Sequence, residues 1–110
     1  MKEIVEPLRK KGIIFKKFHE IDKKRLNTKK KMRIFEGVDL KSRYYAVFFA
    51  EQKSRLLTKN AEEIENLYEK LIVLQDHNFK KKIFLHSSPI CSKARSFLKE
   101  RGWRIFDDLV

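Results

Sequence analysis

The chain has 110 residues, of which 42% are hydrophobic and 38% charged, and 27 Lys and Arg against 15 Asp and Glu give a formal net charge of +12. This length fits one domain with one modest core, and the hydrophobic content excludes disorder along the whole chain. A single cysteine excludes an internal disulfide, and the longest apolar run is too short to span a membrane, so we expect a cytoplasmic protein.

The first part of the chain predicts a short helix, a strand and a basic loop. Ile4, Val5 and Leu8 lie at helical spacing, and Gly12 is a suitable stop. Strand formers occupy positions 13–18. Residues 19–31 are rich in lysine and turn-forming side chains, which predicts a basic loop.

A strand hairpin follows the basic loop. Residues 32–38 and 44–52 carry strand formers, and the short polar link at 39–43 favours an antiparallel turn. The run from Tyr44 to Ala50 is apolar on both faces, as expected of a central strand covered by helices.

The remaining pattern alternates helix and strand. A capping box beginning at Asn60 predicts a helix to about Leu74, and 82–86 is a buried strand. Ser88 and Pro89 are suited to start a helix that stops near Gly102, and 103–106 is a final strand. The fold class is therefore α/β: one domain over 1–110, with a mixed central sheet made of a hairpin plus a parallel β-α-β unit, and helices on both faces.

The strand that begins at Tyr44 ends in a carboxylate and an ammonium group, those of Glu51 and Lys53. Glu51 and Lys53 lie on one face because strand side chains alternate. A carboxylate and a lysine at this spacing can hold Mg²⁺ and steady a phosphate. The alternative is that both charges simply reach solvent at the rim of the sheet.

The predicted elements follow the order helix, hairpin, helix, strand, helix and strand, and Glu-x-Lys closes a hairpin strand. This pattern resembles the restriction-endonuclease-like, PD-(D/E)XK nuclease superfamily. Within it, the small archaeal Holliday junction resolvases look most similar. Gly37-Val38-Asp39 stands where the family often has Pro-Asp. The resemblance implies a homodimeric, Mg²⁺-dependent endonuclease in which Asp39 and Glu51 hold the metal ion and Lys53 orients water. It also makes Glu3 a candidate supporting acid.

The position of the turn decides whether Asp39 can take that role. If the turn lies at Lys41-Ser42, paired residue numbers sum to about 83, and Asp39 then lies several residues from Glu51 along the hairpin. Lys30 or Lys31 would then occupy the acid's place, as in a relative that binds nucleic acid without cutting it.

The net charge makes a polyanion the expected partner, and nucleic acid, DNA before RNA, is favoured over a membrane surface. Lysine, arginine and hydroxyl groups contact phosphates without distinguishing bases, which predicts binding that is independent of sequence. The candidate nucleic-acid contacts are Lys23, Lys24, Arg25, Lys29, Lys30, Lys31, Arg33, Ser54 and Arg55.

Two other functions compete with nucleic-acid binding. One is a non-catalytic domain that contacts an acidic protein or has a structural role. The other is a thiol-dependent, thioredoxin-like protein, because the segment from Phe84 to Ala94 resembles the strand, active-site turn and helix of a glutaredoxin, with Cys91 as its thiol. A small thiol on the apolar stripe of the helix is the simpler account of Cys91.

Overall fold

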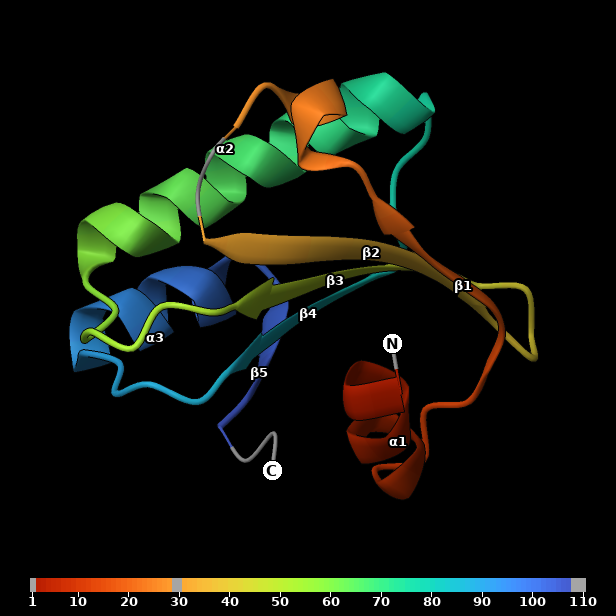
Figure 1. The fold of residues 1–110 in the computed structure, drawn as a ribbon, viewed down its shortest axis with the longest axis horizontal. Helices are drawn as coiled ribbons and strands as arrows, with labels where there is room; N and C mark the ends of the chain where they lie inside the picture. The colour runs from red at the N-terminus through yellow and green to blue at the C-terminus, as the bar shows by residue number, and fades with distance from the viewer. Residues whose placement is uncertain (1, 29–30, 108–110) are drawn as a thin grey trace.

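Five strands form one sheet, and β3 lies at its centre (Figure 1). The computed structural model describes residues 2–28 and 31–107 of the chain. In chain order, the elements are α1 (Lys2–Lys10), β1 (Phe15–Ile21), the 3-10 helix η1 (Lys23–Leu26), β2 (Met32–Asp39), β3 (Tyr44–Ala50), α2 (Thr58–Gln75), β4 (Lys81–His86), α3 (Ser92–Glu100) and β5 (Trp103–Phe106).

The sheet is mixed, as predicted. The strand order is β1-β2-β3-β4-β5; β1, β2 and β3 are antiparallel neighbours, whereas β3, β4 and β5 run parallel. The hairpin is β2-β3, and the parallel β-α-β unit is β4-α3-β5. The α/β fold class is therefore confirmed. No helix in the described part of the chain is both long and apolar enough to cross a membrane.

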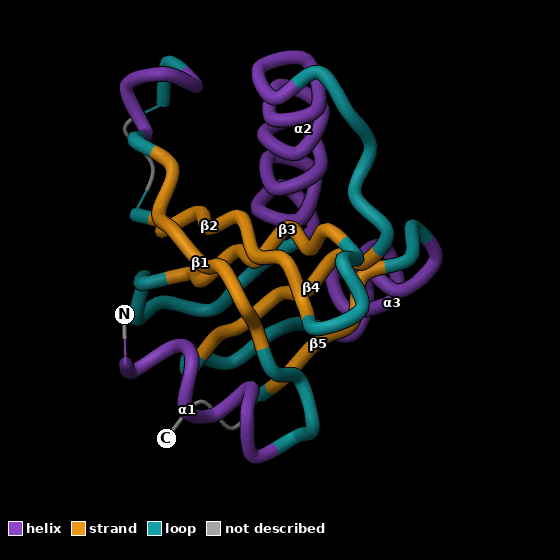
Figure 2. Tube along the Cα trace, turned by 90° about the vertical axis from the view of Figure 1, so that its right-hand side faces the viewer, coloured by secondary structure: helices purple, strands orange, loops and turns teal. Residues whose placement is uncertain are grey.

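The two faces of the sheet carry different helices. α2 and α3 cover one face, and α1 lies alone on the other (Figure 2). Successive β3 side chains alternate between these layers, so Phe48 packs towards α2 and α3 while Val47 packs towards α1. Both are fully buried. This explains why β3 is apolar along its length, and why a charged side chain, Glu51, follows only where the strand ends.

Residues 19–21 and 23–26 of the predicted basic loop form regular structure. β1 continues to Ile21, so residues 19–21 belong to a strand and not to the loop. The next residues form η1, which Asp22 caps by accepting a hydrogen bond from the Lys24 N–H at 3.0 Å. Leu26, only 2% exposed, anchors η1 in the core with α2. One buried leucine among cations has no periodic pattern, so the sequence could not indicate this turn.

α2 begins earlier than the predicted capping box implies. The helix starts at Thr58, and Asn60 lies within its first turn. The Asn60 Oδ1 accepts a hydrogen bond from the Leu57 N–H at 2.8 Å, so Asn60 does stabilise the helix start, but from inside the helix.

α3 begins at Ser92 and not at Pro89. The preceding residues are extended because Ile90 forms a parallel bridge with Leu56. In this bridge the Leu56 N–H donates to the Pro89 carbonyl at 2.8 Å, and the Cys91 N–H donates to the Leu56 carbonyl at 3.0 Å. The bridge fixes the end of the β3-α2 connection against the start of α3.

Candidate nucleic-acid interface at the end of the sheet

Glu51 lies where the hairpin ladder ends. Met32 pairs with Ala50, and the Glu51 N–H donates to the Lys31 carbonyl at 2.9 Å, which extends the ladder by one further pair. Paired residues of an antiparallel ladder point to the same face. Lys31 and Glu51 are therefore neighbours on the face that carries α1, and both are exposed.

The connection from β3 to α2 presents more of the predicted contacts to solvent. Lys53, Ser54 and Arg55 are all exposed. Gln52 shapes this connection, because its Nε2 donates to the carbonyl oxygens of Ser54 at 3.2 Å and Arg55 at 3.4 Å. These hydrogen bonds and the bridge at Leu56 hold the backbone from which the cationic side chains project.

Asp39 lies at the opposite end of the hairpin from Glu51. Val38 pairs with Tyr44 and Met32 with Ala50, so the whole length of the ladder separates the positions of the two carboxylates, roughly 26 Å at about 3.3 Å per residue. The register thus contradicts the prediction that Asp39 and Glu51 share a Mg²⁺ ion and act together in catalysis. The structure instead has the alternative register, in which Lys31 lies opposite Glu51.

Asp39 closes the hairpin turn instead. Its Oδ1 accepts hydrogen bonds from the backbone N–H groups of Lys41 at 2.9 Å and Arg43 at 2.8 Å, and its Oδ2 accepts one from the Arg43 Nε at 2.7 Å. Burial alone would raise the pKa of Asp39, but these hydrogen bonds lower it to about 2.

We expect Asp39→Asn to lower the free energy of unfolding at about pH 7, and this loss to shrink as the pH falls from about 4 to about 2. A carboxyl whose pKa is lower in the folded chain stabilises the fold above its unfolded pKa and loses that contribution as the pH falls towards the folded value. Urea unfolding of both proteins at several pH values measures the difference. A loss that stays constant across this pH range would contradict the assignment of Asp39 to the turn.

Arg33 is the centre of an ion-pair cluster that joins α1, β1 and β2. Its Nη1 contacts the Glu3 Oε1 at 2.6 Å, its Nη2 contacts the Glu20 Oε1 at 2.9 Å, and its Nε donates to the Glu20 Oε2 at 3.2 Å. The hydrogen bond from Arg33 is the largest cause that lowers the pKa of Glu3 to about 2. Arg33 is therefore engaged within the fold and not free for phosphate, and Glu3, the predicted supporting acid, is bound to a guanidinium.

The other described cations of the predicted basic loop lie in two different places, in η1 and directly before β2. Lys23, Lys24 and Arg25 belong to η1, which packs beside α2 (Figure 1). Lys31 lies at the start of the hairpin, at the same end of the sheet as Glu51 and the β3-α2 connection. The predicted contacts Lys29 and Lys30 lie outside the described residues.

Several acidic groups are paired with cations other than the predicted contacts. Besides the Arg33 cluster, the ion pairs are Arg9–Glu6 at 3.9 Å, Arg43–Asp39 at 2.7 Å, Lys82–Glu65 at 3.0 Å and Arg95–Asp107 at 2.7 Å. Within residues 2–28 and 31–107, no ion pair involves Lys24, Arg25, Lys31, Lys53 or Arg55. These exposed cations keep their charge available for an external polyanion.

Sequence reasoning missed a polar cluster at this end of the sheet. His86 ends β4, where it pairs with Ala50 of β3, and is only 3% exposed. Its Nδ1 lies 2.7 Å from the Ser88 carbonyl oxygen, and its Nε2 lies 2.6 Å from the Asp107 Oδ1. Hydrogen bonds from Arg95 of α3 and then from His86 lower the pKa of Asp107. His86, Arg95 and Asp107 come from separate parts of the sequence, so no local motif indicates that they meet.

Cys91 caps α3, and its half-buried side chain packs against the same core as Ile90 and Ala94. Its Sγ accepts a hydrogen bond from the Ala94 N–H at 3.3 Å. This hydrogen bond is the main cause that lowers the pKa of the thiol. The capping role gives Cys91 a structural function at the start of the helix.

The side chains near Glu51 do not fit a divalent-metal site. Mg²⁺ prefers several oxygen ligands in nearly octahedral geometry. Glu51 supplies one carboxylate, but Lys31 faces it, and Glu3 is bound to Arg33. Among the described side chains, no three Asp, Glu, His or Cys gather in a way that could hold an ion. No catalytic step through a metal ion follows from this arrangement.

Two solved structures are similar to this chain over nearly its whole length. A repair endonuclease from Pyrococcus abyssi superposes with a TM-score of 0.58 and 13% identity, covering 96% of this chain and 43% of that one. EndoMS in its apo form superposes with a TM-score of 0.55 and 15% identity, covering 96% of this chain and 41% of that one. This chain therefore spans less than half the length of either protein.

No protein family and no curated protein matches the sequence. The structural likeness bears on the fold alone. The chain has the restriction-endonuclease-like nuclease fold that the Glu-x-Lys hairpin and the order of elements predicted.

Proposed function

We propose that this chain binds nucleic acid, without selecting a base sequence, on its nuclease-like scaffold. The observation that carries the proposal is the set of exposed cations that form no ion pair within the described residues, while several acidic groups are paired with other cations. The proposed contacts are Lys24, Arg25, Lys31, Lys53 and Arg55, together with the Ser54 hydroxyl.

The chemistry of these side chains favours phosphate over base edges. Ammonium, guanidinium and hydroxyl groups donate to phosphate oxygens, which every sequence presents alike. The net charge of +12 attracts the polymer at long range. Because one similar structure is a repair endonuclease, we propose DNA before RNA as the polymer.

We expect the affinity for nucleic acid to fall steeply as salt rises. Each neutralised phosphate of duplex DNA contributes about −0.9 to the slope of log affinity against log salt, so several contacts give a loss of at least tenfold between about 50 and 200 mM. Fluorescence anisotropy with unrelated duplexes, single strands and an RNA hairpin measures the slope and the preferred polymer. A flat salt response, or strong preference for one sequence, would contradict the proposal.

The homodimer that the resemblance implies is a separate proposal. Light scattering on the free protein and on its DNA complex gives the number of chains in each. A single chain in both samples would remove the dimer and leave the binding proposal intact.

A further inference from the structure

We infer that Lys31 occupies the place from which a second carboxylate would share a divalent ion with Glu51, so this end of the sheet contacts phosphate through its own cations and takes no metal ion. The part of this inference that concerns phosphate rests on the proposed function. The part that concerns the metal ion can be tested without nucleic acid.

The ladder fixes the relation between Lys31 and Glu51. Their backbones are joined by the hydrogen bond of 2.9 Å from the Glu51 N–H, directly beyond the Met32–Ala50 pair. Directly paired side chains have Cβ atoms about 4.5–5.5 Å apart on one face of the sheet. A carboxylate at position 31 would lie near enough to Glu51 to share an ion with it, whereas Asp39 at the far end of the strand does not.

The next pair along the ladder on the same face also places a cation in β2. Arg33 pairs with Phe49, so its side chain points to the face of Lys31 and Glu51. Its guanidinium holds Glu3 and Glu20, with the shortest contact, 2.6 Å, to Glu3. Glu3, the predicted supporting acid of α1, is therefore already paired with a cation.

The cations near Glu51 disfavour the binding of a divalent ion, and they can take over its role of neutralising phosphate. Lys31 lies opposite Glu51, and Lys53 and Arg55 follow it along the chain, all of them exposed. A metal ion bound to Glu51 would share this face of the sheet with the cationic side chain of Lys31, and like charges repel. The same ammonium groups can neutralise phosphates without a bridging ion. This arrangement predicts a phosphate-binding surface that neither needs Mg²⁺ nor hydrolyses the polymer.

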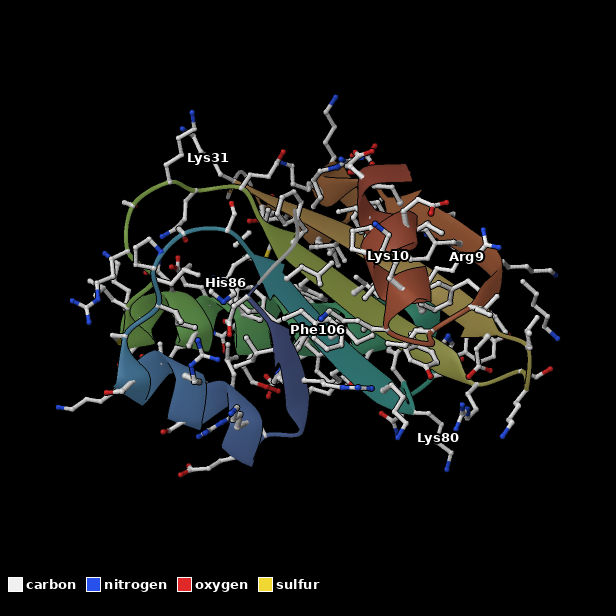
Figure 3. The ribbon with its side chains drawn as sticks, turned by 90° about the horizontal axis from the view of Figure 1, so that it is seen from below. Arg9, Lys10, Lys31, Lys80, His86 and Phe106 are labelled. Carbon is white, nitrogen blue, oxygen red and sulfur yellow. The ribbon has the colours of Figure 1, made fainter. Side chains whose placement is uncertain are left out.

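The decisive experiment measures Mn²⁺ binding by electron paramagnetic resonance on the protein alone. We expect the unsubstituted protein to bind no Mn²⁺ up to about 1 mM, and Lys31→Asp to gain a site with a dissociation constant on the order of 1 mM or below. Adding Glu51→Gln to Lys31→Asp should abolish the gained site. Lys80→Asp is the matched control, because Lys80 lies at the opposite end of the sheet (Figure 3), and it should gain none.

Two outcomes would overturn the inference. One is Mn²⁺ binding by the unsubstituted protein that Glu51→Gln removes. The other is a folded Lys31→Asp protein, as shown by circular dichroism, that binds no Mn²⁺. If the Lys31→Asp chain does not fold, DNA affinity of the unsubstituted protein in EDTA and in Mg²⁺ at equal ionic strength decides. Equal affinity and uncut DNA support the inference, whereas a tenfold gain in Mg²⁺, or cleavage, refutes it.

The result for the metal ion is independent of the proposed function. If the protein binds no nucleic acid in any buffer, the proposed function fails, while the Mn²⁺ comparison between the unsubstituted protein and Lys31→Asp still stands.

Discussion

Reversing the charge at the end of the sheet should nearly abolish DNA binding. In the triple variant Lys31→Glu, Lys53→Glu and Arg55→Glu, three exposed cations of the hairpin start and the β3-α2 connection become anions, so the surface repels phosphates. We expect the affinity at about 50 mM salt to fall on the order of 100-fold or more, and the salt slope to fall by about 3. Fluorescence anisotropy with a mixed-sequence duplex measures both quantities.

A second triple variant separates the local effect from the change in net charge. Lys41, Lys80 and Lys81 are exposed at the opposite end of the sheet, and reversing them to Glu changes the net charge by the same amount. Figure 3 shows Lys80 at the end of the sheet away from Lys31. We expect this control to lose no more than about tenfold in affinity, through the weaker long-range field. Equal losses in both variants would mean that DNA binds the molecule diffusely and not at the proposed surface.

The sequence predicted the sheet because its signals are local and periodic. The apolar run of β3 and the alternation of helix and strand after it indicate a covered central strand and a parallel crossover. Helix starts were less predictable. α3 begins at Ser92 because Leu56 and Ile90 form a bridge between segments far apart in the sequence. No pattern around Ser88 and Pro89 contains that information.

The candidate site depended on a register that the sequence left open. A turn one residue earlier or later changes which side chain faces Glu51, and Ser42 adopts a left-handed conformation, with a φ of 64°, that its residue type does not announce. Asp39 has the residue type of a metal ligand, but it binds the turn backbone and Arg43. From the sequence, Lys30 or Lys31 opposite Glu51 was therefore only one of several possible registers of the hairpin.

The role of Arg33 was hidden for a different reason. Within a cationic segment it is equivalent by sequence to its lysine neighbours, and all of them were predicted to contact phosphate. Only the packing of α1 and β1 around β2 brings Glu3 and Glu20 to its guanidinium. An arginine that alternates with buried residues, as Arg33 does between Met32 and Ile34, is half-buried, and this burial favours an internal partner over solvent.

Removing the side chain that anchors the β3-α2 connection should cause the largest loss of stability. Leu56 is 2% exposed, packs in the core with α2 and α3, and forms the bridge to Ile90. We expect Leu56→Ala to lower the free energy of unfolding by about 2–5 kcal/mol, because it removes buried methyl groups and leaves a cavity. Urea unfolding followed by circular dichroism measures the loss.

The neighbouring residue provides a control that links this stability to binding. Leu57 has the same side chain but is 50% exposed, so Leu57→Ala should change stability by no more than about 0.5 kcal/mol. Under conditions where both variants are folded, Leu56→Ala should also weaken DNA binding several-fold, because the backbone that carries Lys53 and Arg55 loses its anchor, whereas Leu57→Ala should bind as the unsubstituted protein does. Undiminished binding by a folded Leu56→Ala protein would mean that the connection need not be held rigid to contact phosphate, and that its flexible cations act only through their charge.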